Sequence, residues 1–308
     1  MTPSLSHMKW SLDDVLREVR AANLDLAVES TEVLGGGIEF QVFLARLKGR
    51  EPVVLKFPGE RWIFNDNDQG LDSFQLLDQE HALLGRSRQH GIPAPHVVAY
   101  LRPVRGPHVL ILEFIDTDAV PVDPFELGRI VRRLHELPSH GLSPIAQRGQ
   151  PAAITVAQLT AARLGVVARS AGLPEPLPSE EFLSRRLRPI DQSACLLHMD
   201  LRPANYLSRQ GHLLGLIDWS NALVAHPLLE LARLEEYGEL TERFAEGYDS
   251  PMLLAELQSP LGLCCRLYTA AMLAVVFLSE APDPDLAAMK VARLRDLLAQ
   301  LRNVSDDG

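Results

Sequence analysis

The sequence predicts an α+β protein in which a small β-rich part, residues 1–115, precedes a larger and mainly helical part, residues 116–308. Two observations carry this prediction. Short segments rich in Val, Leu and Phe, separated by glycines, fill much of the first part, as expected for antiparallel strands joined by tight turns. Segments with apolar residues at helical spacing dominate after residue 124. Strands that are followed by helices, rather than alternating with them, favour two lobes of different structure.

The first part begins with a predicted helix. Ser11 and Asp14 are spaced as in a capping box, which predicts a helix over residues 11–22. A second helix is predicted to end at Gly91. The full set of predictions for this part is strands at residues 26–34, 40–47, 52–57, 96–101 and 108–114, a polar loop at 61–72 and a helix at 73–90.

The second part follows from a join near residues 113–118 and is predicted to be helical, with one exception. Residues 194–219 alternate short apolar pairs with polar residues and contain a turn at Gly211, which is typical of short strands. Helices are predicted at residues 125–137, 153–170, 179–187, 227–236, 241–248, 261–280 and 285–301.

Composition excludes several classes of protein. The chain has 308 residues and a net charge of −10, from 30 basic and 40 acidic residues, which argues against nucleic acid as a partner. An acidic balance fits a cationic substrate weakly, and a solvated acidic surface is the simpler explanation. Three cysteines without a CxxC pair predict a reduced, cytoplasmic setting. The N-terminal ten residues lack an apolar signal core, and residues 270–278 are too few to span a membrane and predict a buried helix instead.

One segment carries most of the functional prediction. His198, Asp200 and Asn205 form the pattern H-x-D-x-x-x-x-N, and Asp218 follows Asn205 by 13 residues at the end of an apolar run. Phosphoryl transfer needs a carboxylate to accept the proton of the attacking hydroxyl. It also needs oxygen ligands that hold Mg²⁺ against the nucleotide phosphates.

The segment resembles the aminoglycoside phosphotransferase and choline kinase-like family, whose members read H-G-D-x-H-x-x-N and then I-D-W or I-D-F. The resemblance covers residues 31–248. It implies a two-lobed, protein-kinase-like fold and an enzyme that uses ATP and Mg²⁺ to phosphorylate a hydroxyl group of a small molecule. By the same resemblance Asp200 is the catalytic carboxylate, and Asn205 and Asp218 are the magnesium ligands.

Upstream residues are similar to the nucleotide-binding elements of that family. Lys56 lies near the end of a predicted strand and Glu80 in the helix that follows, which implies an ion pair that holds the lysine on the α- and β-phosphates. The triplet Gly35, Gly36 and Gly37 either covers the phosphates or is a plain hairpin turn. Residues 110–115 resemble the hinge, where the backbone of Glu113 and Ile115 would meet the adenine edge.

The sequence departs from the family pattern within the catalytic segment. Met199 stands where the family has Gly, a residue that the chemistry does not require. Arg202 stands where a His is common, and it either neutralises the transferring phosphoryl group or forms a salt bridge elsewhere on the loop.

A second set of departures lies downstream. His226 and Glu230 replace the two aspartates of the family's G-D-P-x-x-D run. Glu230 is expected to be able to take the place of the second aspartate, whereas His226 when protonated cannot accept the same hydrogen bonds. His135 is expected to be structural.

Three functions are weighed for a chain with these residues. The first is a kinase for a small hydroxylated substrate, with aminoglycosides, amino alcohols, hydroxy amino acids and sugar amines all open. The second is a catalytically impaired, kinase-like nucleotide-binding or interaction protein, which the departures at Met199 and His226 would favour. A protein kinase is disfavoured because Asp218 is followed by Trp219 and no Ala-Pro-Glu segment follows. The sequence leaves the oligomeric state open.

Overall fold

The computed structural model describes residues 9–24, 26–37, 39–118 and 120–305, and its contacts divide the chain into two compact units. The first comprises Met1–Phe64, Asp68–Val122 and Asn205–Ser220. The second comprises Asn65–Asn67, Asp123–Ala204 and Asn221–Gly308. The α+β class is confirmed, while the functional division at residues 115 and 116 stays a prediction. The expectation for the N-terminus falls largely on residues 1–8, which lie outside the described residues.

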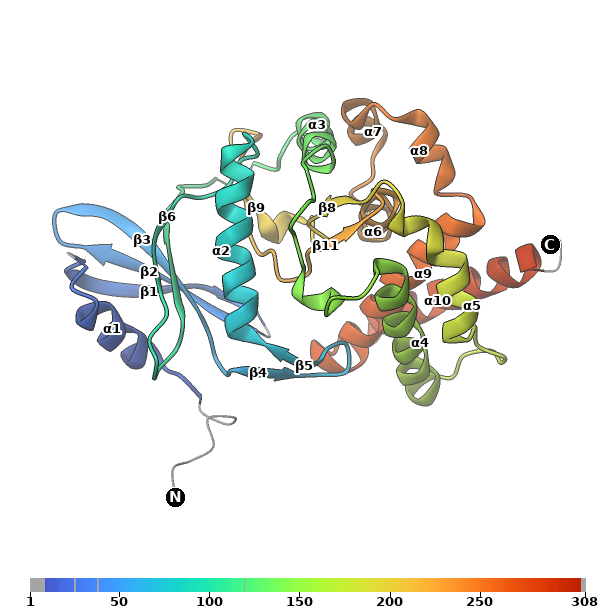
Figure 1. Cartoon of the computed structure of the whole chain (residues 1–308), viewed down its shortest axis with the longest axis horizontal. Coiled ribbons are helices and arrows are strands. Elements are labelled where there is room, and N and C mark those ends of the chain that lie inside the picture. The colour runs from blue at the N-terminus through green and yellow to red at the C-terminus, as the bar shows by residue number, and fades with distance from the viewer. Residues whose placement is uncertain (1–8, 25, 38, 119, 306–308) are drawn as a thin grey trace, which may run out of the picture. The chain divides into compact units, whose positions relative to one another are not determined.

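A five-stranded antiparallel sheet forms the first unit, with strand order β1-β2-β3-β7-β6 (Figure 1). The predicted strands are therefore confirmed within two residues at each end. Their bounds are β1 (Val28–Gly36), β2 (Phe40–Leu47), β3 (Arg50–Pro58), β6 (Val97–Leu101) and β7 (Val109–Glu113).

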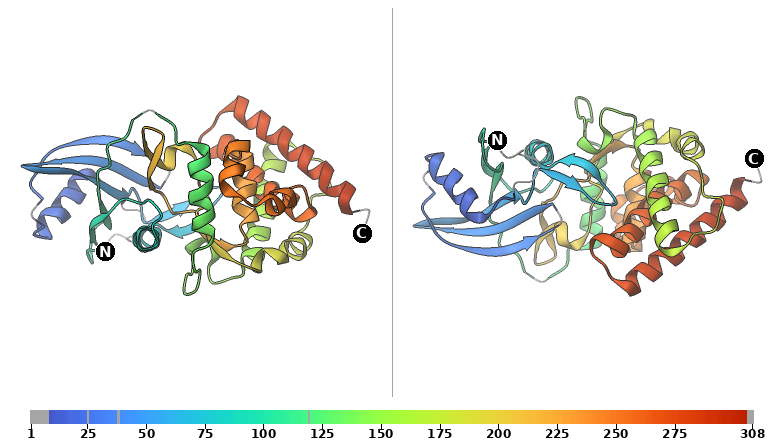
Figure 2. Two further views of the ribbon diagram at one scale, coloured as in Figure 1. Left: turned by 90° about the horizontal axis from the view of Figure 1, so that it is seen from above. Right: turned by 90° about the horizontal axis from the view of Figure 1, so that it is seen from below.

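Helix α1 (Leu12–Ala21) packs against this sheet, as the views in Figure 2 show. Ser11 and Asp14 form the predicted capping box. Val15 and Val19 of α1 bury themselves against alternate residues of β2, β3 and β7, among them Leu55 of β3. Because side chains alternate along a strand, Lys56, which follows Leu55, points to the opposite face of the sheet.

Asp72 caps the N-terminus of helix α2 (Ser73–Gln89). Its Oδ1 accepts a hydrogen bond from the Phe74 N–H at 3.0 Å. The predicted loop before it is wrong, because residues 62–72 form the hairpin β4 (Trp62–Phe64) and β5 (Gln69–Asp72). Polar composition hid these strands, since backbone pairing across a turn does not need an apolar pattern. A second hairpin, β9 (Tyr206–Arg209) and β10 (His212–Leu216), completes the first unit.

The second unit is mainly helical, as predicted. Close contact between α3 and α7 depends on glycine, because a Cβ at Gly128 would lie 2.2 Å from the Phe244 carbonyl oxygen. The helices are α3 (Pro124–His135), α4 (Ala152–Ala171), α5 (Glu180–Leu187), α6 (Leu228–Tyr237), α7 (Glu242–Tyr248), α8 (Pro251–Glu256), α9 (Pro260–Val275) and α10 (Pro284–Ser305). Two short strands, β8 (Cys195–Leu197) and β11 (Leu223–Ala225), pair with each other.

The sequence did not predict α8 or β11, and it joined α9 to the π-helical turn Val276–Glu280 that follows it. Among the described residues, one helix, Pro260–Glu280, is long and apolar enough to cross a membrane by length and composition. However, 72% of its most apolar window is buried inside the protein. This burial is what the sequence predicted for residues 270–278.

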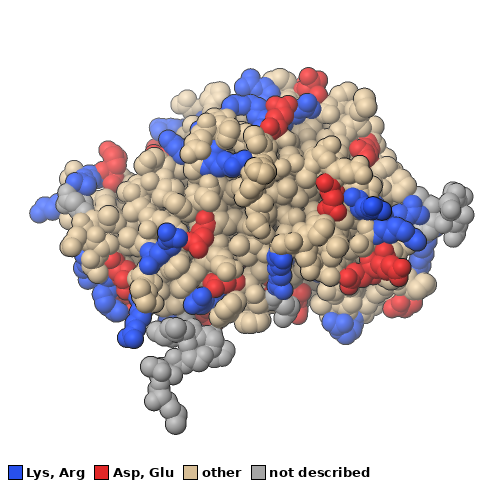
Figure 3. Space-filling view, viewed as in Figure 1, with Lys and Arg blue, Asp and Glu red and all other residues tan. Residues whose placement is uncertain are grey.

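Charged side chains are mixed on the face of the molecule that Figure 3 shows. Lys and Arg lie among Asp and Glu there, and neither sign covers the face continuously. The net charge therefore gives no extended acidic surface on this face to select a cationic partner.

Candidate active site

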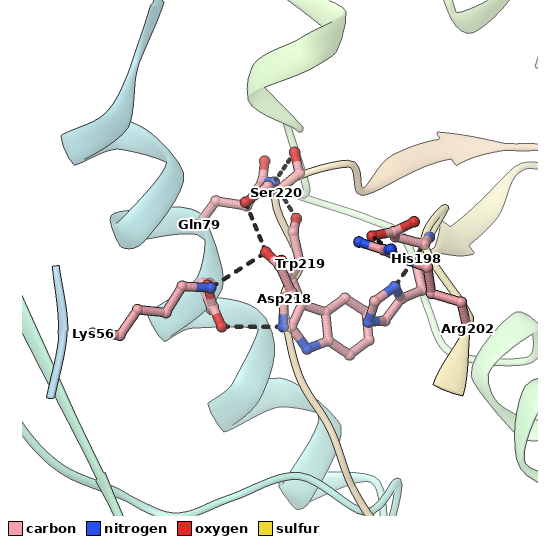
Figure 4. Close-up of polar contacts among 9 residues, drawn as sticks. Lys56, Gln79, His198, Arg202, Asp218, Trp219 and Ser220 are labelled. Carbon is pink, nitrogen blue, oxygen red and sulfur yellow. Dashed lines mark hydrogen bonds and ion pairs between the residues drawn. The ribbon is translucent and has the colours of Figure 1, made fainter. Parts of the chain in front are cut away.

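Lys56 of β3 lies at the centre of a buried polar cluster in the first unit (Figure 4). Strand alternation turns its side chain away from the core of Leu55, and it is only 6% exposed. Its ammonium group lies 4.6 Å from the centre of the Phe40 ring, a cation–π contact that covers one side of the charge.

Glu80 of α2 binds two parts of the first unit with its two carboxylate oxygens. Oε2 accepts a hydrogen bond from Lys56 Nζ at 2.5 Å, and Oε1 accepts one from the Asp218 N–H at 3.2 Å. Lys56 Nζ also donates to Asp218 Oδ1 at 3.2 Å. Burial by itself lowers the pKa of Lys56, but the facing carboxylates of Asp218 and Glu80 raise it above its ordinary value. The predicted ion pair between Lys56 and Glu80 is therefore present, and the lysine in it is charged.

Asp218 follows β10 in a left-handed backbone conformation, with φ of 66°. Asp tolerates this region better than most residues, because its short side chain can hydrogen-bond locally. Ser220 Oγ donates to Asp218 Oδ1 at 3.0 Å, and Gln79 of α2 donates to the Trp219 carbonyl oxygen at 2.7 Å (Figure 4). Consecutive residues of α2 thus hold the segment that carries Asp218.

The hairpin of β9 and β10 brings Asn205 and Asp218 to its open end. Tyr206 pairs with Leu216, and the Ile217 N–H donates to the Asn205 carbonyl oxygen at 3.2 Å. The 13-residue separation in sequence therefore becomes proximity in space. Amide and carboxylate oxygens suit Mg²⁺, which keeps several waters and needs few protein ligands. Among the described residues, no group of three or more His, Cys, Asp or Glu could hold a metal ion.

The glycine triplet lies at the end of β1, where the chain enters the turn to β2. Gly35 and Gly36 pair with Val42 and Gln41 of β2, and the Gly37 N–H donates to the Phe40 carbonyl oxygen at 3.0 Å. A Cβ at Gly35 or Gly37 would meet nothing within 4 Å, and none of the three has a positive φ. The fold itself therefore does not require glycine here.

Glu113 and Ile115 lie at the end of β7, where the hinge was predicted. The Glu113 N–H donates to the His96 carbonyl oxygen at 2.9 Å, and Glu113 Oε1 accepts from the His96 N–H at 2.6 Å. Ile115 follows, and its Cδ1 would lie 3.5 Å from a Cβ at Gly215 in β10. Both residues belong to the same unit as Lys56.

Asp200 and Arg202 lie in the second unit, in the loop after β8. His198 is fully buried, and its Nδ1 accepts a hydrogen bond from the Asp200 N–H at 3.2 Å. Met199 between them has φ of 62° and is also fully buried. The positive φ explains why a glycine suits this position, a backbone reason that sequence reasoning missed.

Glu230 of α6 holds this loop by its backbone. Its carboxylate accepts hydrogen bonds from the N–H groups of Met199 at 2.5 Å and His198 at 3.2 Å. His135 of α3 lies 2.8 Å from the same carboxylate through Nε2 and 2.8 Å from the Tyr248 hydroxyl through Nδ1. The sequence has Glu230 where the family has Asp, which left the contacts to the loop in question. The structure shows that Glu230 makes contacts to the loop.

The Asp200 carboxylate has a partner on each oxygen. The Tyr237 hydroxyl of α6 donates to Oδ1 at 2.7 Å, and Arg202 Nε donates to Oδ2 at 3.2 Å. Burial first, and then Asp200 itself, raise the pKa of Tyr237 to about 12, so the phenol remains a donor at neutral pH. The sequence left two alternatives for Arg202, neutralising the transferring phosphoryl group or forming a salt bridge on the loop. The structure contains the salt bridge, to Asp200.

His226 also fits its position. Its Nδ1 accepts a hydrogen bond from the Leu228 N–H at 3.3 Å, at the start of α6. Burial lowers the pKa of His226, so the imidazole is neutral and able to accept. Neither Met199 nor His226 disrupts the loop around Asp200.

Sequence reasoning missed Tyr237, Gln79 and Glu39. Tyr237 could have been found, because it lies seven residues after Glu230 and therefore on the same helical face. Glu39 is partly buried, and this burial, together with Asp218 and Asp68, raises its pKa to about 8. No local pattern marks Glu39 or Gln79.

The fold is that of the kinase-like aminoglycoside phosphotransferases, as comparison with solved structures shows. The chain belongs to the phosphotransferase enzyme family, whose family model matches residues 30–251. A sequence search of the curated proteins found no match.

Solved structures of low identity share the fold over nearly their whole length. Wild-type aminoglycoside 2'-phosphotransferase-IIIa with GDP has a TM-score of 0.61 and 18% identity, covering 94% of this chain and 99% of that one. The streptomycin–ATP ternary complex of APH(2")-IIa has a TM-score of 0.60 and 15% identity, covering 95% of this chain and 99% of that one. A fructosamine-3-kinase candidate from Haemophilus somnus 129PT has a TM-score of 0.67 and 13% identity, covering 92% of this chain and 95% of that one. The predicted family and fold are therefore confirmed.

Proposed function

We propose that this phosphotransferase uses Mg²⁺ and ATP to phosphorylate a hydroxyl group of a small molecule. In that reaction a bond forms between the acceptor oxygen and the γ-phosphorus, and the bond from that phosphorus to the β–γ bridging oxygen breaks. ADP leaves with the electron pair, and the acceptor proton passes to a carboxylate of the enzyme. The buried arrangement of Lys56 between Glu80 and Asp218 is the observation that best supports the proposal.

Lys56 is proposed to bind the α- and β-phosphates. A charged lysine held by two carboxylates is oriented, so it loses little conformational freedom when it binds an anion. Glycines that the fold does not require at Gly35, Gly36 and Gly37 suit a backbone that a ligand approaches closely. The backbone at Glu113 and Ile115 is proposed to meet the adenine edge.

Asn205 and Asp218 are proposed to hold the magnesium ion. Bound magnesium would neutralise charge on the β- and γ-phosphates. The hairpin presents one amide and one carboxylate at the same end, and Lys56 and Ser220 orient the carboxylate.

Asp200 is proposed to accept the proton of the acceptor hydroxyl. The hydrogen bonds from Tyr237 and Arg202 fix the orientation of its carboxylate. Arg202 is 51% exposed in its side chain and so can move from Asp200 to the transferring phosphoryl group. Nothing at Met199 or His226 favours the catalytically impaired alternative.

The acceptor is proposed to be a small hydroxylated compound, and the enzyme to be cytoplasmic. Neighbouring structures named for aminoglycoside and fructosamine phosphorylation support this acceptor class. Three cysteines that are all buried and free suit a reducing compartment.

Two aspartate variants test the proposal, because the proposed roles differ. Asp200→Asn should lose turnover by orders of magnitude and keep its affinity for nucleotide, since the base does not hold ATP. Asp218→Asn should weaken binding of Mg–ATP as well as turnover. Calorimetry with a non-hydrolysable ATP analogue, with and without Mg²⁺ and beside the GTP analogue, measures the nucleotide affinity of both variants. An ATP-consumption assay measures their turnover. Equal loss of nucleotide affinity in the two variants would contradict the assignment.

A further inference from the structure

Two arginines are buried in the helical unit without a salt bridge. Arg163 of α4 is 4% exposed and Arg233 of α6 is 2% exposed. Nε of both guanidinium groups and Nη1 of Arg163 have no hydrogen-bond partner within the described part of the chain. No salt bridge joins either arginine to a described carboxylate.

These arginines form a continuous series of contacts that ends at Asp200. The Tyr268 ring of α9 lies 4.9 Å from the Arg163 guanidinium and 5.9 Å from that of Arg233. Arg233 in turn lies 5.8 Å from the ring of Tyr237, whose hydroxyl donates to Asp200. Arg233 is therefore separated from the proposed proton acceptor by the Tyr237 side chain, and Arg163 lies further along the same series of contacts.

A buried guanidinium without an anion is costly, because burial removes water that nothing replaces. Arg266 of α9 shows how the same unit treats a structural arginine. It is equally buried at 4% exposure, and its Nε also has no partner among the described residues, yet its Nη1 lies 3.4 Å from Glu235 and its Nη2 lies 3.4 Å from Gln258. Arg163 has no such partner, so its charge is better explained by a partner that arrives with the substrate.

We propose that Arg163 and Arg233 bind an anionic group of the acceptor, so that the substrate is a small alcohol bearing a carboxylate or a phosphate. Arginine suits both groups, because its planar fork donates two parallel hydrogen bonds. Cation–π contacts to Tyr268 hold the guanidinium groups in place while the anion is absent. The proposal rests on the proposed function, and it replaces the cationic acceptor that net charge alone would suit.

A panel of matched acceptors tests the substrate class. An ATP-consumption assay compares hydroxy acids and hydroxy amino acids with their methyl esters. It also compares sugar phosphates with the free sugars. Aminoglycosides are assayed beside all of these acceptors. We expect kcat/KM at least tenfold higher for the anionic member of a pair, and the preferred pair distinguishes carboxylate from phosphate. Preference for the uncharged or cationic members would overturn the proposal.

Variants of the arginines test the residues. Arg163→Met and Arg233→Met should raise KM for the anionic acceptor tenfold or more and leave affinity for the ATP analogue unchanged. Arg163→Lys, which keeps the charge, should give an intermediate KM and guards against misfolding of the methionine variant. Arg266→Met is the matched control, expected to lower Tm and leave KM unchanged.

The thermal stability of the variants separates a binding role from a structural one. Arg163→Met should keep or raise Tm, because it removes an uncompensated charge. A fall in Tm like that of Arg266→Met, with KM unchanged, would make Arg163 structural and refute the proposal.

If no acceptor is phosphorylated, the proposed function fails, but anion binding can still be measured. Thermal shifts of the wild type with inorganic phosphate and with a hydroxy amino acid would then be compared with those of Arg163→Met. Stabilisation of the wild type alone supports the anion site, and equal shifts reject it.

Discussion

Glu230→Gln tests whether the α6 carboxylate holds the loop that carries Asp200. Glu230 is 1% exposed and accepts hydrogen bonds from the N–H groups of Met199 and His198, with His135 Nε2 at 2.8 Å. Glutamine has the same shape, but its NH₂ group cannot accept. A hydrogen bond to a charged group contributes about 1.5–3 kcal/mol, so two perturbed donors should lower the free energy of unfolding by about 3–5 kcal/mol.

The pH dependence gives the same variant a second signature. Burial by itself raises the pKa of Glu230, but hydrogen bonding and charge from His135, with His198 and the Met199 N–H, lower it below its ordinary value. Since the folded pKa is the lower one, the stabilisation is complete above an unfolded pKa of about 4.3. It is lost as the pH falls through the lowered value. The difference between wild type and Glu230→Gln should therefore shrink at acid pH.

Urea unfolding followed by far-ultraviolet circular dichroism, at neutral pH and at acid pH, measures both effects. Glu246→Gln, an exposed glutamate of α7, is the control and should change stability by less than about 0.5 kcal/mol. A loss below about 1 kcal/mol for Glu230→Gln, or a difference that does not depend on pH, would refute the reasoning.

Three further outcomes are expected. Lys56→Ala and Glu80→Ala should be non-additive in kcat/KM with a coupling of about 0.5–3 kcal/mol, and additivity in the double variant would show that Glu80 does not act through Lys56. Met199→Gly relieves a positive φ worth about 1 kcal/mol but removes a fully buried side chain worth about 2–5 kcal/mol, so chemical unfolding should show a net loss. Gly37→Ala should leave the free energy of unfolding within about 0.5 kcal/mol of wild type, because a Cβ there meets nothing within 4 Å. The same variant should weaken nucleotide binding in calorimetry, and unchanged affinity would leave the glycines as a plain turn.

The sequence by itself determined the class of fold, most of the elements and the family. A short run rich in Phe, Val and Leu between glycines located β2 at residues 40–47, and the capping box located α1, because both signals depend only on neighbours along the chain. The spacing of Asn205 and Asp218 was also informative, since a hairpin of fixed length converts it into proximity. The pairing of Lys56 with Glu80 followed from the resemblance to a known family.

Only the tertiary structure decided which side chains surround the proposed catalytic groups. Arg163, Arg233 and Tyr268 come from α4, α6 and α9, and no local pattern distinguishes these arginines from the paired Arg266. The positive φ of Met199 likewise depends on the packing of the loop against Glu230. Helical periodicity states which face of a helix is buried, but the partner of a buried charge is set by which other helices pack against that face.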